Sequence, residues 1–177
     1  MCGSYGLTTK NIKDINKRFI VVNQLDIYSP RYNIRPGQMN PVITSQSPNQ
    51  ISLMLWGFIP HFAPDRNYKY KSINAKSETL AEKPTFQESL RHKRCIIPAT
   101  FFYEPDKINF TKPPFPWHLF CLKNQELFGF AGLYDVWKDK KSDQTITSYA
   151  IITTAPNKLV GKIHDRMPAI LTKENEQ

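Results

Sequence analysis

The stretch Thr145-Ile146-Thr147-Ser148-Tyr149-Ala150-Ile151-Ile152-Thr153-Thr154 mixes β-branched residues with an aromatic ring, a composition typical of a β-strand. It runs into a turn at Ala155-Pro156-Asn157. Upstream, residues 127–133 form another apolar run, and the polar segment 138–143 between the two has the character of an exposed hairpin loop. We therefore predict two antiparallel strands joined by this loop.

Other strand-like and helix-like segments lie upstream and downstream of this pair. Residues 51–56, 94–97 and 117–122 favour strands. Residues 11–23 show an imperfect amphipathic pattern, residues 85–92 follow Pro84 with Thr85 as the expected cap, and residues 156–163 favour a third short helix. Fourteen prolines against seven glycines argue against a helical bundle. The sequence predicts one α+β domain over residues 1–177, built mainly on antiparallel strands.

Charge and cysteine usage narrow the functional class. The chain of 177 residues has 24 Lys and Arg against 15 Asp and Glu, a net charge of +9, which attracts polyanions such as nucleic acid. Its cysteines, Cys2, Cys95 and Cys121, match no metal-binding spacing, and we expect free thiols in a reducing, cytoplasmic compartment. The Lys-, Asn- and Ile-rich composition suggests a bacterium with AT-rich DNA. We find neither a signal peptide nor the roughly 18 apolar residues of a membrane span. We expect no membrane association, metal or cofactor.

Cys2 has chemistry that no internal cysteine can have. A small second residue permits removal of Met1, and Cys2 would then be the amino terminus. This creates an α-amine of pKa about 7.7–8.0 beside a thiol of pKa about 8.5, so both groups are partly nucleophilic near neutral pH. An aldehyde can condense with the amine to an imine, and the thiol can close a five-membered thiazolidine ring. An ordinary cysteine at position 2 remains the alternative reading.

Three internal segments carry other candidate groups. Residues 72–79 are polar, and an exposed loop is one reading of them. Residues 94–104 place Glu104 after an apolar, aromatic run, where burial would raise its pKa toward acid–base use, although a solvated strand end remains open. Residues 163–171 set His164 and Arg166 between apolar flanks, and His164 is either a proton shuttle or structural. P-loop, GxGxxG, GxSxG and HExxH motifs do not occur, which removes most nucleotide-binding, hydrolase and zinc-protease readings.

Together these segments resemble the SOS response–associated peptidase family, whose members recognise abasic sites in single-stranded DNA. The resemblance spans nearly the whole chain, in order. It rests on residues 1–3, 31–36, 56–61, 74–79, 81–84, 94–104, 131–134, 152–154 and 163–171. It implies a curved, barrel-like sheet with short flanking helices.

The resemblance also implies the chemistry of the site. The ring-opened abasic sugar presents an aldehyde, which Cys2 would capture as a thiazolidine crosslink after Met1 is lost. Asn74 would orient the sugar, Glu104 would move protons during imine formation and ring closure, and His164 would assist sugar ring opening. A minor abasic-site lyase activity and autoproteolytic removal of Met1 are further implications. We expect a monomer, because capture of one lesion needs one copy.

The residues expected to hold DNA are Gly3, Arg35, Pro36, Lys76 and Arg166. The segment 56–62 also lies where family members meet DNA, in a position to stack on bases.

The chain departs from the family pattern near this DNA site. Lys76 and Ser4 stand where the family has Arg, Pro105 replaces a Trp, and Thr100-Phe101 replaces Asp-Gly. The chain ends at Gln177, whereas the family commonly continues, so we expect a short member or a truncated chain.

Two other functions compete with abasic-site capture. A noncatalytic basic protein would bind single-stranded nucleic acid with strong salt dependence and no covalent product. A cysteine peptidase acting on other proteins would use Cys2 and His164 as a dyad.

Overall fold

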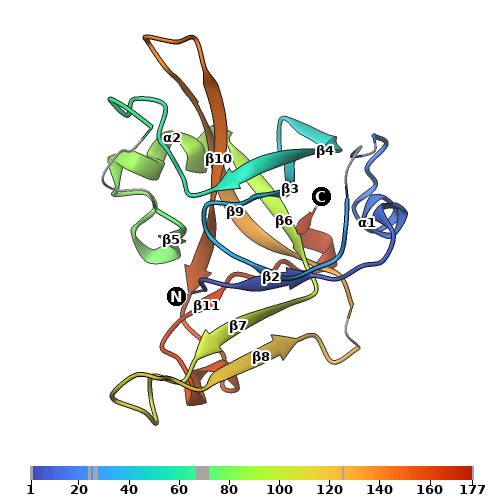
Figure 1. Cartoon of the computed structure of the whole chain (residues 1–177), viewed down its shortest axis with the longest axis vertical. Helices are drawn as coiled ribbons and strands as arrows, with labels where there is room; N and C mark the ends of the chain where they lie inside the picture. The colour runs from blue at the N-terminus through green and yellow to red at the C-terminus, as the bar shows by residue number, and fades with distance from the viewer. Residues whose placement is uncertain (1, 24, 26–27, 67–71, 125, 177) are drawn as a thin grey trace.

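The computed structural model describes residues 2–23, 25, 28–66, 72–124 and 126–176. Its strands form two sheets, and two α-helices and three short 3₁₀ turns flank them (Figure 1). The strands are β1 (Tyr5–Leu7), β2 (Arg31–Ile34), β3 (Met39–Thr44), β4 (Ser47–Trp56), β5 (Asn74–Lys76), β6 (Arg94–Ala99), β7 (Phe101–Pro105), β8 (Trp117–Cys121), β9 (Phe128–Lys138), β10 (Thr145–Thr154) and β11 (Met167–Pro168). The helices and turns are α1 (Ile12–Phe19), η1 (Ser77–Thr79), α2 (Pro84–His92), η2 (Val160–Lys162) and η3 (Lys173–Glu176).

The larger sheet closes into a barrel. Its strands run in the order β10-β4-β3-β6-β9, and β9 pairs again with β10, which completes the ring. The β9–β10 pair is antiparallel from Thr145↔Lys138 to Ile151↔Gly132, with residues 139–144 as the connecting loop. This confirms the predicted hairpin and the predicted α+β, barrel-like architecture. The β4–β10 pair is parallel, so closure depends on strands far apart in the sequence.

Beyond its pairing with β4, the end of β10 gains two short neighbours. β5 pairs with it in parallel, matching Ile151 with Asn74 and Thr153 with Lys76. β11 pairs with it antiparallel, matching Thr154 with Met167. These pairings bring residues 74–76 and the segment before Met167 to the same end of the barrel.

The smaller sheet has the order β2-β1-β7-β8, and all its pairs are antiparallel. The chain passes from the barrel into this sheet at Thr100, between β6 and β7, where the Thr100 hydroxyl donates to the Gly6 carbonyl. A buried aromatic cluster joins the two sheets: the Tyr5 ring contacts Trp56 at 5.2 Å and Phe130 at 5.6 Å between centroids. Such pairs add stability beyond the area that they bury. The cluster thus holds β1, and with it Cys2, against the barrel.

Two predicted helices differ in detail from the structure. Lys83, not Thr85, is the N-cap of α2, because Pro84 occupies the first helical position, where its missing N–H costs nothing. Residues 156–163 form only the 3₁₀ turn η2, and the Asn157 side chain caps its approach by accepting from the N–H groups of Leu159 and Val160. Among the described residues no helix is long and apolar enough to cross a membrane.

Candidate functional site

Cys2 lies just before β1 and is fully buried. Its Sγ is 3.7 Å from the Ser4 carbonyl oxygen, and its own carbonyl accepts a 2.9 Å hydrogen bond from Asn74 Nδ2. Burial, reinforced by the nearby negative charge of Glu104, raises the pKa of the Cys2 thiol well above its usual range. The thiol is therefore protonated at neutral pH and needs a base before it can attack.

Glu104 is the fourth residue of β7 and points into the protein, because alternate residues of this strand face the core. Its side chain is fully buried, and burial raises the pKa of its carboxyl from 4.5 to about 7. A carboxyl with this pKa populates both its acid and its base form near neutral pH. Glu104 can therefore both donate and accept a proton in one reaction cycle.

His164 follows η2, where its N–H donates to the Val160 carbonyl. Its Nε2 lies 3.6 Å from Glu104 Oε2, and its Nδ1 accepts a 3.1 Å hydrogen bond from the Arg166 N–H. Burial lowers the pKa of the imidazole, so the ring is neutral at pH 7. With Nδ1 as acceptor, we assign the ring proton to Nε2, which faces Glu104. The Asp165 carboxylate lies 3.0 Å from Nδ1 but is largely exposed. It would accept a hydrogen bond from Nδ1 if the ring carried a proton there.

Asn74 begins β5 and is placed by its neighbours on both sides. The Trp56 indole donates to the carbonyl of Ile73, and Asn74 pairs in register with Ile151. Its Nδ2 donates to the Cys2 carbonyl, while its buried Oδ1 has no hydrogen-bond partner among the described residues. The four residues predicted as catalytic therefore meet as two contacts, Cys2 with Asn74 and Glu104 with His164, and the charge of Glu104 acts on Cys2.

The residues predicted to bind DNA differ in how exposed they are. Gly3 is half-buried beside Cys2, while Arg35, Pro36 and Lys76 are exposed. Arg166 instead has partners within the protein.

The guanidinium of Arg166 makes two hydrogen bonds to the Glu78 carboxylate, at 2.6 and 2.9 Å, and a third of 2.6 Å to the Thr153 carbonyl. Only 14% of its side chain is exposed. A phosphate would therefore have to compete with Glu78 for this arginine.

The segment 56–62 corrects one sequence-based expectation. Trp56 and Phe58 are fully buried, so their rings belong to the core and are not available to stack on bases. Phe62, half-exposed at 50%, keeps that possibility. The inward–outward alternation of a strand cannot predict which of these rings are buried, because β4 ends at Trp56. The chain continues through Gly57, whose φ of 143° is favoured by glycine.

Two positioning contacts escaped the sequence reading. The Lys107 N–H donates to the Ile163 carbonyl, which ties the end of β7 to the segment that carries His164. The buried Asp106 carboxylate accepts from the N–H groups of Ile108 and Asn109 and shapes the turn in between. An Asp followed three residues later by Asn is a turn signal that could have been read as such.

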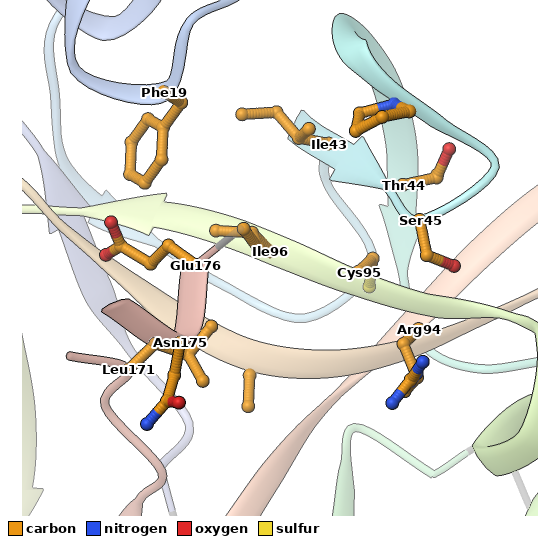
Figure 2. Close-up of a pocket in the computed structure, with 12 residues that line it drawn as sticks. Phe19, Ile43, Thr44, Ser45, Arg94, Cys95, Ile96, Leu171, Asn175 and Glu176 are labelled. Atoms are coloured by element: carbon orange, nitrogen blue, oxygen red, sulfur yellow. The ribbon is translucent and has the colours of Figure 1, made fainter. Parts of the chain in front are cut away.

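The four clustered residues do not line the pocket on the barrel wall. A pocket of about 450 Å³ lies on the barrel wall, where Phe19, Ile43, Ile96 and Glu176 surround it, and none of the four clustered residues lines it (Figure 2). Within the part of the chain that the structure describes, no three His, Cys, Asp or Glu side chains form a group that could hold a metal ion.

Comparison with known proteins places the chain in a family. The family model of the SOS response associated peptidase matches residues 1–177. The chain is 43% identical over 180 residues to the abasic site processing protein YoqW of Bacillus subtilis, covering all of this chain and 79% of that protein. It is 34% identical over 173 residues to the abasic site processing protein HMCES of Xenopus tropicalis, covering 82% of this chain and 52% of that protein.

A solved structure extends the comparison to the fold. The crystal structure of a protein from Bacteroides thetaiotaomicron superimposes with a TM-score of 0.88 at 29% identity, covering 99% of this chain and 79% of that one. The match over the full chain and the identity to these relatives show that this chain belongs to the SOS response associated peptidase family.

Proposed function

We propose that this protein captures abasic sites in single-stranded DNA as a covalent thiazolidine through Cys2, after Met1 has been removed. The observation that carries the proposal is the burial of Cys2 against Asn74, within reach of the charge of a Glu104 whose pKa lies near 7. The relatives named for abasic site processing support the choice of substrate.

Removal of Met1 comes first, because an amide nitrogen is not a nucleophile. Hydrolysis of the Met1–Cys2 peptide bond consumes one water, releases methionine and leaves the amine of Cys2. We propose that the protein performs this step itself, with Glu104 as the group that activates water, since its carboxylate form is populated at neutral pH.

Capture then proceeds in three balanced steps. The C1′–O4′ bond of the abasic sugar breaks, the C1′ hydroxyl gives up its proton to become the aldehyde, and O4′ takes a proton. We propose that Glu104 in its acid form supplies the proton to O4′ and recovers one from the C1′ hydroxyl, while the Nε2–H of His164 hydrogen-bonds the departing oxygen. The Cys2 amine adds to C1′, and the carbinolamine loses water to give an imine, with Glu104 as the acid that protonates the departing hydroxyl. The thiol adds to the imine carbon while its proton passes to nitrogen through Glu104, so the net reaction releases one water.

The arrangement also explains why an imine would be short-lived. The Cys2 thiol and amine belong to one residue, and an intramolecular attack is favoured by proximity over reaction with solvent. An imine that escapes ring closure can lose a C2′ proton and the 3′ phosphate, which is the minor lyase reaction that we propose. The contact shown for His164 Nε2 is with Glu104, which favours proton transfer over a Cys–His peptidase dyad.

Incubation with a single-stranded oligonucleotide carrying one abasic site tests the proposal on a denaturing gel. The wild-type protein should give a shifted band without added reductant, whereas Cys2→Ala should give none. An oligonucleotide with a tetrahydrofuran in place of the abasic sugar, which cannot open to an aldehyde, is the matched control. Equal band intensity with Cys2→Ala would refute covalent capture through this residue.

A further inference from the structure

The smaller sheet turns one apolar face toward solvent. Along β7 and β8 alternate side chains point inward, and the remaining ones point out. We call Phe101, Tyr103, Trp117 and Leu119 the outer face. Register places Leu119 opposite Tyr103 and Trp117 opposite Pro105, and 52% of Trp117 and 50% of Leu119 are exposed.

Trp117 differs from the other two tryptophans of the chain. Trp56 and Trp137 are buried, and their indole N–H groups donate to the carbonyls of Ile73 and Ala63. Trp117 instead lies open to solvent on a short strand. Trp117 and Leu119 lie next to each other on the outer side of β8, so their exposed apolar surface is a candidate contact surface.

Arg35 and the sheet register place Trp117 at the end of the sheet that carries Cys2. The Arg35 guanidinium lies 5.9 Å from the centroid of the Trp117 ring, although their strands are separated by β1 and β7. Between them, the Tyr103 N–H donates to the carbonyl of Ser4, two residues after Cys2. In Figure 1, β7 ends and β8 begins on the left side of the molecule, the side that β5 and β11 also reach. The outer face therefore leads toward the Cys2 site.

We propose that the outer face binds the bases of single-stranded DNA next to the abasic site, with Trp117 as the stacking platform and Arg35 contacting the adjoining phosphate. The inference rests on the proposed function, since it names how that substrate is held. Sheet faces with exposed aromatic rings and neighbouring arginines are suited to unpaired bases, because every base has a face that stacks.

The positive charge of the protein and of Arg35 favours DNA over a protein partner for this outer face. The net charge of +9 and the placement of Arg35 beside the ring suit a polyanion. Trp117 also pairs directly with Pro105, the last residue of β7.

Intrinsic fluorescence offers a direct test, because Trp117 is the one exposed indole among the three. Titration with a short undamaged single-stranded oligonucleotide should quench the solvent-exposed part of the emission of the full chain. Trp117→Phe should lose this quenching yet retain most of the affinity. Trp117→Ala should weaken binding about 10-fold, the loss of one base stack. Leu53→Ala, an exposed apolar residue on β4, is the matched control and should change nothing.

Crosslinking kinetics separate this inference from the proposed function. With an abasic oligonucleotide, Trp117→Ala should raise the half-saturating DNA concentration about 10-fold and leave the rate at saturation unchanged. With deoxyribose 5-phosphate, which has the sugar but no base, the variant should react like the wild type. A wild-type protein that captures neither compound refutes the proposed function. The wild type could instead capture the abasic oligonucleotide while its fluorescence is not quenched by DNA and Trp117→Ala keeps the same half-saturating DNA concentration. That result would overturn DNA binding by the outer face and would indicate a different partner for it. A slower reaction of Trp117→Ala with the free sugar also overturns it.

Discussion

Replacing Glu104 with Gln should make the protein more stable at neutral pH and should remove one specific pH dependence. Burial raises the pKa of the Glu104 carboxyl from 4.5 to about 7. The unfolded chain therefore loses this proton at lower pH than the folded chain does. The stability linked to Glu104 is fully present below pH 4.5 and is lost as the pH rises to about 7.

The size of the effect follows from the same pKa. Each unit of difference between folded and unfolded pKa is about 1.4 kcal/mol, so ionisation of Glu104 costs about 3 kcal/mol of unfolding free energy above pH 7. Gln has nearly the same shape and stays neutral. The Glu104→Gln variant should match the wild type near pH 4.5 and exceed it by about 3 kcal/mol above pH 7, roughly 6 to 12 °C in melting temperature for a chain of this size.

Urea denaturation of both proteins at a series of pH values measures the difference directly. His164 contributes in the opposite direction: its lowered pKa gives stability that is present above its usual pKa of 6.5 and lost at lower pH. Because both proteins retain His164, subtraction of the two curves isolates Glu104. Because we propose that Glu104 acts in the removal of Met1, both proteins are first treated with an added aminopeptidase, and intact mass verifies that each has lost Met1. A difference that stays constant from pH 4.5 to 8, or one that favours the wild type at pH 8, would refute a raised pKa for Glu104.

The remaining predictions concern placement and packing. Asn74→Ala should slow crosslinking about 100-fold at saturating DNA, because the Cys2 carbonyl loses its 2.9 Å hydrogen bond and the nucleophile its orientation; an unchanged single-turnover rate would rule out this role. Gly6→Ala should lower the unfolding free energy by about 1 to 3 kcal/mol, because a Cβ there would lie 2.1 Å from the Phe101 ring. A urea midpoint equal to that of the wild type would contradict this packing.

Strands could be predicted from the sequence where local composition alone indicates them. Residues 145–154 have the same bounds in the sequence prediction and in β10, since β-branched residues fill the strand and a proline turn ends it. Barrel closure was not readable, because it depends on the parallel pair Ser148↔Leu55 across more than half the chain. β3 was also missed: it contains Pro41, a residue that ordinarily argues against a strand.

The candidate site residues could be proposed from the sequence, but the distances between them could not. Family order singled out Cys2, Asn74, Glu104 and His164, and the apolar run before Glu104 correctly indicated burial and a raised pKa. The bidentate Glu78–Arg166 pair joins positions 88 residues apart, and nothing in either local sequence signals it.

The Arg35–Trp117 contact was equally hidden from the sequence. It depends on how four strands align at one end of a sheet. Such contacts arise from tertiary packing and lie outside local patterns.

Intact mass of the product formed with an abasic oligonucleotide tests the central claim most directly. The account predicts a species whose mass equals the protein without Met1 plus the oligonucleotide, less one water, and a proteolytic fragment that places the adduct on Cys2 at the new amino terminus. A product that retains Met1, or an adduct located on a lysine and formed equally by Cys2→Ala, would contradict it.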